Sequence, residues 1–309
     1  MTFTVTEPIA ITPAMVTSHS VAKLDPSPPW LTGATYAKGD LVHRAETLYV
    51  YRRTAAGDGV TPPEDAPELW QRLRPANKYA MWDFYKSTRT ESESAPLVVA
   101  FKPGKRIDTL GIYGAQGTSI TVEGKSGGAT IFGPVTRSLQ KRFVRSWLEW
   151  FTAPFTQVKA TEFTGLPLVS DIELVVTITP SSGLAACQYM ACGKEEFIGD
   201  VEWEPQITGS NFSTIERNFD GSLEPGVSLI PRRTVPKQTL NVVIPAANVD
   251  RVRAIRDRLN AVPALWSGIS EAPHSDYYES VLIFGIYRAL DYSPANVHFA
   301  TGTIEVEEI

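Results

Sequence analysis

Short apolar runs that alternate with polar residues are the feature of this sequence that most limits its fold. The clearest run covers residues 172–179, where isoleucine, leucine, valine and isoleucine occupy every second position. Strict alternation over this length is typical of an antiparallel strand with one buried face. Similar short strands are expected at 97–101, 107–113 and 118–124, with no helical pattern between them. Repeated strands without helices exclude a doubly wound nucleotide-binding fold in this region.

Changes in composition divide the 309 residues into an N-terminal arm and three domains. Residues 1–29 contain five prolines and no long apolar period, which predicts an extended arm or linker. Residues 30–75 carry short aromatic runs between turns and predict a small β module near the lower size limit for independent folding. Residues 76–205 predict a β-sandwich and residues 206–309 an α+β domain. The predicted fold class is therefore mainly β and multidomain.

The α+β assignment depends on a strand, a helix and a long hairpin near the C-terminus. A strand is expected at 240–245, and Asn248 is expected to cap the helix that follows. The helix shows apolar residues three or four positions apart until Pro263, namely Val252, Ile255, Leu259 and Val262. Two long strands, 280–290 and 297–309, are expected to pair through a turn at 293–296.

Charge, hydropathy and cysteine content exclude several classes of protein. The chain has 29 basic and 34 acidic residues, both scattered, which argues against a general nucleic-acid binder. No apolar stretch approaches the roughly 20 residues of a membrane-spanning helix, so no membrane insertion is expected. The first fifteen residues lack the basic start and apolar core of a secretion signal. Cys187 and Cys192 are expected to be buried free thiols rather than a disulfide, as in a reducing cytoplasm.

The motif search gives no catalytic or metal-binding candidate. The segment 124–128 ends like a phosphate-binding loop, but Ser119 stands where that pattern needs glycine, so a hairpin turn is expected. The histidines are far apart and lack ligand spacing; they are His19, His43, His274 and His298. No serine lies in a GxSxG elbow. We therefore expect no enzyme, no cofactor and no metal site.

An aromatic segment at 141–151 has two alternative interpretations. Its apolar residues are Phe143, Val144, Trp147, Leu148, Trp150 and Phe151, and they alternate with Lys141, Arg142, Arg145 and Glu149. Aromatic rings beside basic groups can stack on sugars or nucleic-acid bases. The density of apolar residues, however, favours a segment packed against the sandwich, because exposed patches of this size are uncommon.

The small module contains the candidate ligand-binding residues. An aromatic face can cover the apolar face of a sugar while polar groups at its rim bind the hydroxyls. Trp30, Tyr36 and Tyr51 are the candidates for such carbohydrate binding. Tyr49 and Trp70 are expected to be core residues instead, because so small a fold needs aromatic residues in its core.

The small module resembles a known family. The residues that carry the resemblance are Tyr36, Gly39-Asp40, the strand 48–51, Pro62-Pro63 and the closing Trp70. In this pattern it is similar to the small chitin-binding modules of carbohydrate-binding families 5 and 12, which implies a sugar ligand. One difference is that residues 52–54 are Arg-Arg-Thr, where chitin-binding members carry exposed aromatic residues.

Two weaker resemblances cover the remainder of the chain. Segments 98–124 and 171–205 resemble galactose-binding-type jelly rolls, and 211–222 with 281–309 resemble modules of phage tail-tip and baseplate proteins. Together the three parts resemble a bacteriophage or prophage tail protein. The resemblance implies a homo-oligomeric virion component that is assembled in the host cytoplasm, lies in the tail, and contacts other tail proteins and host surface glycans.

Three functions follow as hypotheses. A structural, non-enzymatic tail component is favoured by the lack of a catalytic set, the proline-rich arm and the series of small β modules. The alternative is a free carbohydrate-binding protein or the targeting part of a chitin-degrading system. The third is a glycan depolymerase whose site forms only in an oligomer.

Overall fold

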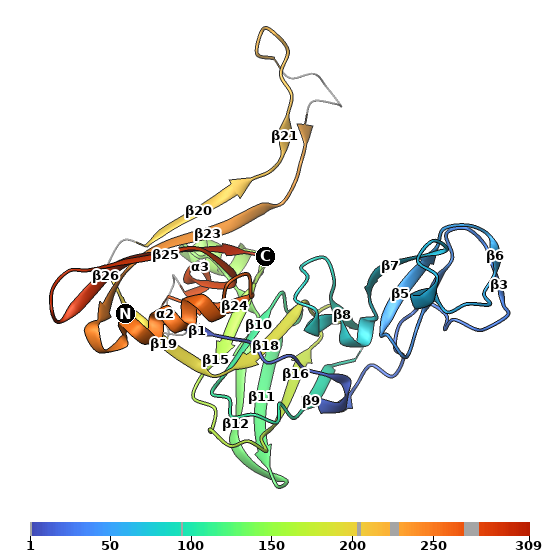
Figure 1. Ribbon diagram of the computed structural model, residues 1–309, viewed down its shortest axis with the longest axis horizontal. Helices are drawn as coiled ribbons and strands as arrows, with labels where there is room; N and C mark the ends of the chain where they lie inside the picture. The colour runs from blue at the N-terminus through green and yellow to red at the C-terminus, as the bar shows by residue number, and fades with distance from the viewer. Residues whose placement is uncertain (1, 94, 203–204, 223–228, 269–277) are drawn as a thin grey trace. The chain divides into compact units, whose positions relative to one another are not determined.

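The protein is mainly β and consists of two compact units, as the computed structural model in Figure 1 shows. The structure describes residues 2–93, 95–202, 205–222, 229–268 and 278–309. Strands account for 49% and helices for 12% of the residues that the structure describes, which confirms the predicted mainly β, multidomain fold class. Unit 1 combines residues 1–8 with 194–309, and unit 2 covers residues 9–193. Among the described residues, no helix is long and apolar enough to cross a membrane.

Unit 1 is built on a closed antiparallel sheet. Its strands follow the order β19 (Glu195–Val201), β1 (Thr2–Thr6), β24 (Ala264–Ser267), β25 (Leu282–Pro294), β26 (Phe299–Glu308) and β23 (Thr234–Pro245). A further pairing of β19 with β23, between Asp200 and Val243 and between Val201 and Val242, closes the sheet into a barrel. Closure pairs backbone N–H and C=O groups that an open sheet would leave unpaired at its edge strands.

The interior of unit 1 is filled from the strands and from helix α2 (Val249–Arg258). Val252 and Ile255 on α2 are buried, which confirms the predicted apolar face of the helix. Trp266 is fully buried, stacks on Phe3, and donates from its indole nitrogen to the carbonyl of Gly285 at 3.0 Å. The predicted cap at Asn248 is wrong, because a 3₁₀ turn at Ala246–Asn248 runs directly into the helix and the Asn248 side chain makes no capping bond. The hairpin from β25 to β26 turns near the predicted position.

The N-terminal residues do not form the predicted arm. Strand β1 lies between β19 and β24, and β2 (Val16–His19) pairs with the edge of a sheet in unit 2. The sequence pattern missed β1 because five residues are too short for a clear period, and its partners lie about two hundred positions further along the chain. The boundary expected at 205 also differs, since β19 belongs to the barrel and unit 2 ends at residue 193.

Two sheets around one core form the larger part of unit 2. The first has the order β12 (Ala129–Ser138), β11 (Ser119–Ser126), β16 (Glu173–Thr179), β9 (Leu97–Phe101) and β2; the second has β15 (Ala160–Phe163), β10 (Thr109–Tyr113) and β18 (Tyr189–Gly193). Leu174, Val176 and Ile178 of β16 are buried while the alternate positions are not, as the alternation predicted. Both sheets contribute to a single buried cluster. The segment 124–128 lies at the hairpin of β11 and β12, as expected. A pair of short strands, β8 (Thr90–Glu93) and β17 (Leu184–Cys187), completes this part.

The small module forms its own aromatic core within unit 2. It contains a sheet of β4 (Leu41–His43), β5 (Tyr49–Arg53) and β7 (Trp70–Pro75), and a second pair, β3 (Thr35–Tyr36) with β6 (Gly57–Asp58). The core consists of Tyr36, Val42, Tyr51, Ala66 and Trp70.

Asp25 joins the proline-rich segment to the end of this module. Its side chain is fully buried and accepts hydrogen bonds from Arg74 at 2.7 and 3.2 Å, from Ser27, and from the Asn77 amide at 3.0 Å. Burial acts to raise the pKa of the Asp25 carboxyl, but the bonds from Arg74, Ser27 and Asn77 outweigh it and hold the pKa below its ordinary 3.8. Asp25 therefore connects three segments of unit 2 as an ionised group.

The two cysteines are buried free thiols, as predicted. They lie on consecutive strands, β17 and β18, and both contribute to the same core cluster. Burial raises the pKa of each thiol to about 12.

We expect neither Cys187 nor Cys192 to react with a thiol reagent in the native protein, because both are buried and only the thiolate attacks. In a disulfide-exchange assay, the native protein in buffer should release no reagent thiol rapidly. In denaturant the same protein should release two equivalents of reagent thiol per chain. Rapid reaction of either thiol in buffer would contradict the burial of these strands.

Candidate functional site

The residues predicted to stack on sugars do not form an exposed face. Tyr36 and Tyr51 are only 8% and 5% exposed, and both belong to the module core. The Tyr36 hydroxyl bonds to the backbone of Leu31, and the Arg44 guanidinium lies 4.7 Å over the ring of Trp30. Sugar stacking needs an uncovered ring face, so the predicted site is not assembled. The physical reason is size, because a module this small uses its aromatic residues to fill its core.

The remaining aromatic residues of the module are covered as well. Trp70 is buried, as predicted, and Arg53 lies over its ring. Tyr49 packs against the same core from a partly buried position, with the Arg72 guanidinium 4.7 Å above it. The large apolar residues exposed between 30 and 75, a range that the structure describes in full, are all aliphatic: Leu31, Leu41, Val60 and Leu73. The module therefore presents no aromatic platform.

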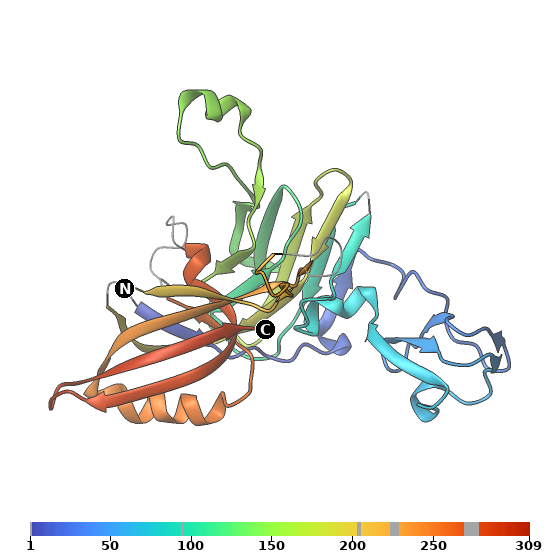
Figure 2. The same ribbon diagram turned by 90° about the horizontal axis from the view of Figure 1, so that it is seen from above.

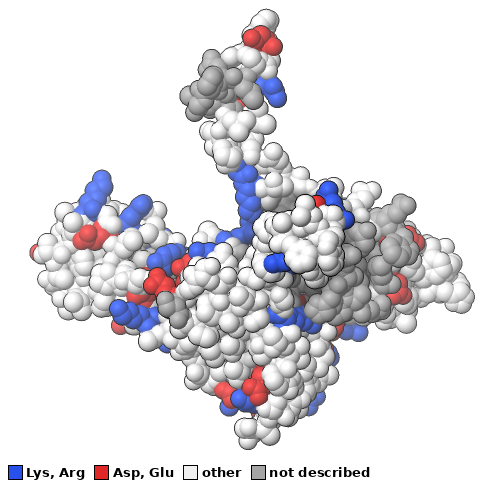
Figure 3. Space-filling model, turned by 180° about the vertical axis from the view of Figure 1, so that it is seen from behind, with Lys and Arg blue, Asp and Glu red and all other residues white. Residues whose placement is uncertain are grey.

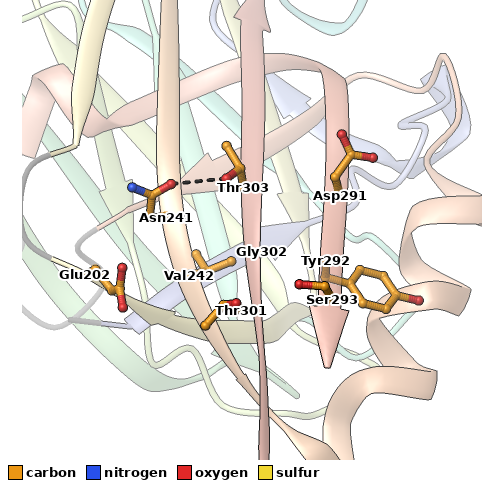
Figure 4. Close-up of a pocket in the computed structure, with 9 residues that line it drawn as sticks. All are labelled: Glu202, Asn241, Val242, Asp291, Tyr292, Ser293, Thr301, Gly302 and Thr303. Carbon is orange, nitrogen blue, oxygen red and sulfur yellow. Dashed lines mark hydrogen bonds between the residues drawn. The ribbon is translucent and has the colours of Figure 1, made fainter. Parts of the chain in front are cut away.

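A shallow groove lies on unit 1. It has a volume of about 560 Å³ and is lined by Glu202, Asn241, Val242, Asp291, Tyr292, Ser293, Thr301, Gly302 and Thr303. Figure 4 shows these side chains spread along β23, β25 and β26, with Glu202 and Asp291 on opposite sides. Thr303 donates to Asn241 at 3.1 Å, and no histidine or cysteine is among the nine lining residues. Its serine and threonine hydroxyls make no hydrogen bond to Glu202 or Asp291, so the described residues of the groove show no nucleophile paired with a base.

Metal binding finds no support in the part of the chain that the structure describes. No group of three or more histidine, cysteine or acidic residues lies close enough there to hold an ion. His19, His43 and His298 lie apart, and His274 is outside the described residues.

The aromatic loop, residues 140–157, is the most unusual surface of unit 2. Two short strands, β13 (Gln140–Lys141) and β14 (Thr156–Gln157), form its base, and helix α1 (Trp147–Thr152) lies between them. Figure 2 shows the loop projecting from the sheet of unit 2. Its apolar side chains are exposed: Phe143, Val144, Trp147, Leu148, Trp150, Phe151 and Phe155. The prediction that this segment packs against the sandwich is wrong.

Contacts within the loop give it a defined shape. The Ser146 side chain accepts from the amide of Glu149, and the Glu149 carboxylate accepts from the amide of Arg145 at 2.6 Å. This reciprocal arrangement satisfies amides at the start of α1. Arg142 donates to the carbonyl of Trp150 at 2.9 Å, and its guanidinium lies 3.9 Å over the ring of Phe155. The polar groups are thus bonded inside the loop while the apolar groups face outward.

The hairpin arm, residues 206–237, is the corresponding feature of unit 1. Strand β20 (Gln206–Asn211) pairs with the first part of β23, and β21 (Thr214–Ile215) pairs with β22 (Leu229–Ile230) further out. Figure 1 shows the arm extending well beyond the barrel. Its large apolar side chains are exposed, namely Ile207, Phe212, Ile215, Phe219, Leu229 and Ile230.

Ion pairs attach the base of the arm to the barrel. Lys237 pairs with Glu307 at 3.3 Å, and Arg233 pairs with Glu308 at 3.0 Å. Arg288 of β25 also contacts Glu307. Basic side chains at the base of the arm are visible in Figure 3. Several charges in one network hold the base more firmly than one exposed pair would.

Comparison with protein-family models and with curated proteins finds no match to this chain. The density of apolar residues in the aromatic loop is visible in the sequence, but their exposure is not. For the arm the signal was weaker, since Phe212, Ile215 and Phe219 are isolated apolar residues in a polar segment.

Proposed function

We propose that this protein is a structural, non-enzymatic subunit of a bacteriophage tail tip or baseplate that assembles as a ring of identical copies. The observation that carries the proposal is the hairpin arm, whose apolar side chains are covered by no described residue of the same chain. A neighbouring copy is the partner that every subunit of a ring has available.

The energetics of the arm favour a partner. An isolated two-stranded hairpin is only marginally stable in water, because it buries little apolar surface. The exposed residues of the arm include two phenylalanines, three isoleucines and one leucine. Burial stabilises by roughly 25 cal/mol for each Å² of apolar surface removed from water. An arm that lies on a neighbour would recover this free energy and gain pairing for its free strand edge.

The geometry also favours a directional contact. The barrel strands are paired to one another, so their edges are not open to a second chain. An arm that binds a different surface of the next copy makes a head-to-tail contact, and such contacts close into a ring when the rotation permits. This arrangement suits the resemblance of 211–222 and 281–309 to tail-tip and baseplate modules.

The alternative functions receive less support. A free carbohydrate-binding protein would use the aromatic residues of the small module, and Tyr36 and Tyr51 are buried. A depolymerase needs two carboxyl groups that flank a glycosidic bond together with a surface that holds the sugar rings. Glu202 and Asp291 line one groove, but Tyr292 is the one aromatic residue among the nine that line it. A contact with host glycans, if it exists in the virion, would have to use other residues.

Shortening the hairpin arm is expected to abolish the oligomer. Asn211 and Thr234 are register partners, so an Asn-Gly turn inserted directly between them would replace residues 212–233 and continue the ladder. Native mass spectrometry of the full chain should give a multiple of 33.9 kDa, and the shortened chain should be a monomer. Its unfolding temperature should stay unchanged, because the described residues of the removed segment lie outside the barrel core.

A point variant serves as the matched comparison for this experiment. Phe219→Ser removes one fully exposed side chain and is expected to weaken the oligomer without unfolding the barrel. A full-length chain that is monomeric at high concentration would contradict the proposal, and so would a shortened chain that keeps the same oligomer. Labelling of virions with an antibody should place the protein at the tail; label confined to the capsid would contradict the tail assignment.

A further inference from the structure

We infer that the aromatic loop is a lipid-binding element that inserts its apolar tip into the interface of an anionic membrane. The partner is a lipid surface, and the inference depends on the loop alone, not on the hairpin arm or the proposed ring. The proposed contact reaches only the interface of the membrane. The finding that no described helix is long and apolar enough to span a bilayer does not bear on such a contact.

The first argument is the kind of side chain that is exposed. Trp147 and Trp150 are 79% and 57% exposed, and Phe143, Phe151 and Phe155 are exposed beside them. Tryptophan is enriched at membrane interfaces, where its ring lies among the apolar chains and its polar edge stays near water. Exposed residues of this kind on one short loop cost free energy in water unless a partner covers them.

The second argument is the order of apolar and charged groups along the loop. The helix α1 carries Trp147, Leu148, Trp150 and Phe151 at the tip, whereas Lys141 and Arg142 lie at or next to the paired strands at the base. Arg145 precedes the helix. An anionic membrane has phosphates at its surface and hydrocarbon beneath them, so the apolar tip of the loop matches the hydrocarbon and the basic residues at its base match the phosphates. The loop can therefore bury its tip while its cations stay among the headgroups.

The third argument concerns the one acidic residue of the loop. Glu149 is the only Asp or Glu between positions 140 and 157, against three basic residues. Its carboxylate is bonded to the amide of Arg145 within the loop. An acidic group pointed at the membrane would be repelled by anionic headgroups, and here that group is bonded to the backbone at the start of α1.

A protein groove on a second copy is a poorer match for the loop. Three surface depressions of this chain each contain two or more charged side chains, such as Glu202 with Asp291 and Asp40 with Arg74. Filling such a depression with tryptophan rings would remove charged side chains from water, which costs free energy. A fluid lipid phase can surround side chains that leave α1 in several directions and needs no complementary groove.

Vesicle sedimentation tests the inference with the full chain. Vesicles of phosphatidylglycerol mixed with phosphatidylcholine should bind the protein, and vesicles of phosphatidylcholine alone should bind about tenfold more weakly, since the loop carries three basic residues and one acidic residue. The double variant Trp147→Ser with Trp150→Ser should lose binding to both. Brominated lipids should quench tryptophan fluorescence in the wild type and much less in the double variant.

Tyr85→Ser is the matched control, because Tyr85 is an aromatic residue of unit 2 with similar exposure outside the loop. This variant should bind vesicles as the wild type does. Failure of the wild type to bind would overturn the inference, as would equal binding by the double variant. A different result is that the wild type does not bind vesicles while the double variant changes the mass of the oligomer. In that case the loop binds a second copy of the chain, and the inference is wrong. The arm-shortened chain should still bind vesicles, which separates this result from the test of the ring.

Discussion

Deletion of residues 2–8 is expected to unfold unit 1 while unit 2 remains folded. Strand β1 lies between β19 and β24 and pairs with both, so its loss opens the barrel and leaves each of these strands with one unpaired edge. Phe3 and Val5 are buried in the core of the same unit, and Phe3 stacks on Trp266. Removing one large core side chain costs about 3–5 kcal/mol, and a domain has only about 5–15 kcal/mol in total. The deletion should therefore exceed the stability of the barrel.

Calorimetry of the full chain can measure this effect. The deletion should remove one unfolding transition and keep the transition that belongs to residues 9–193. Phe3→Ala is the graded variant and should lower the stability of unit 1 by about 3–5 kcal/mol without abolishing the fold. Val297→Ser, at an exposed position of the same unit, should have little effect. A deletion variant that kept both transitions would show that β1 is dispensable, contrary to its position in the sheet.

Asp25→Ala is expected to destabilise unit 2 by about 3 kcal/mol. The variant removes a buried carboxylate that joins Arg74, Ser27 and Asn77, and leaves their donors without an acceptor. The estimate lies at the lower end of the range for a broken buried ion pair, because Arg74 is partly exposed and can regain water. Chemical denaturation should show this loss, and Glu68→Gln, an exposed acidic position of the same module, should show almost none.

The same carboxylate predicts a pH dependence. The folded pKa of Asp25 lies below its ordinary 3.8, so the unfolded chain binds the proton first. The stability that the Asp25 carboxylate contributes is therefore fully present above pH 3.8 and is lost as the pH falls through the pKa of Asp25 in the folded state. The stability difference between wild type and Asp25→Asn should shrink in that acid range. Burial lowers the pKa of His19 from 6.5 to about 4, so His19 reduces the stability of the folded chain as the pH falls below 6.5. This effect is the same in the wild type and in Asp25→Asn and does not change the difference between them. A difference that stays constant down to strong acid would contradict the ionised state of Asp25.

Local patterns predicted the elements whose partners are close in sequence or whose period is long. The alternation at 172–179 became β16, and the apolar spacing after Asn248 became α2. Strand β1 could not be predicted in this way, since its pairing with β19 and β24 depends on residues far along the chain. Burial was also beyond the sequence. Tyr36 and Tyr51 fill a small core, whereas Trp147 and Trp150 are exposed, although all four are aromatic residues in aromatic-rich segments.

The position of β1 far ahead of its partners in the sequence also sets an order of events during synthesis. Residues 2–6 are made well before β19, which begins at residue 195, and β24, which begins at residue 264. At about 5–20 residues per second, the strand waits on the order of 10 to 40 seconds before its first partner is made. Residues 9–193 can complete their own core in that interval. The barrel therefore closes only after the residues of unit 2 have been made.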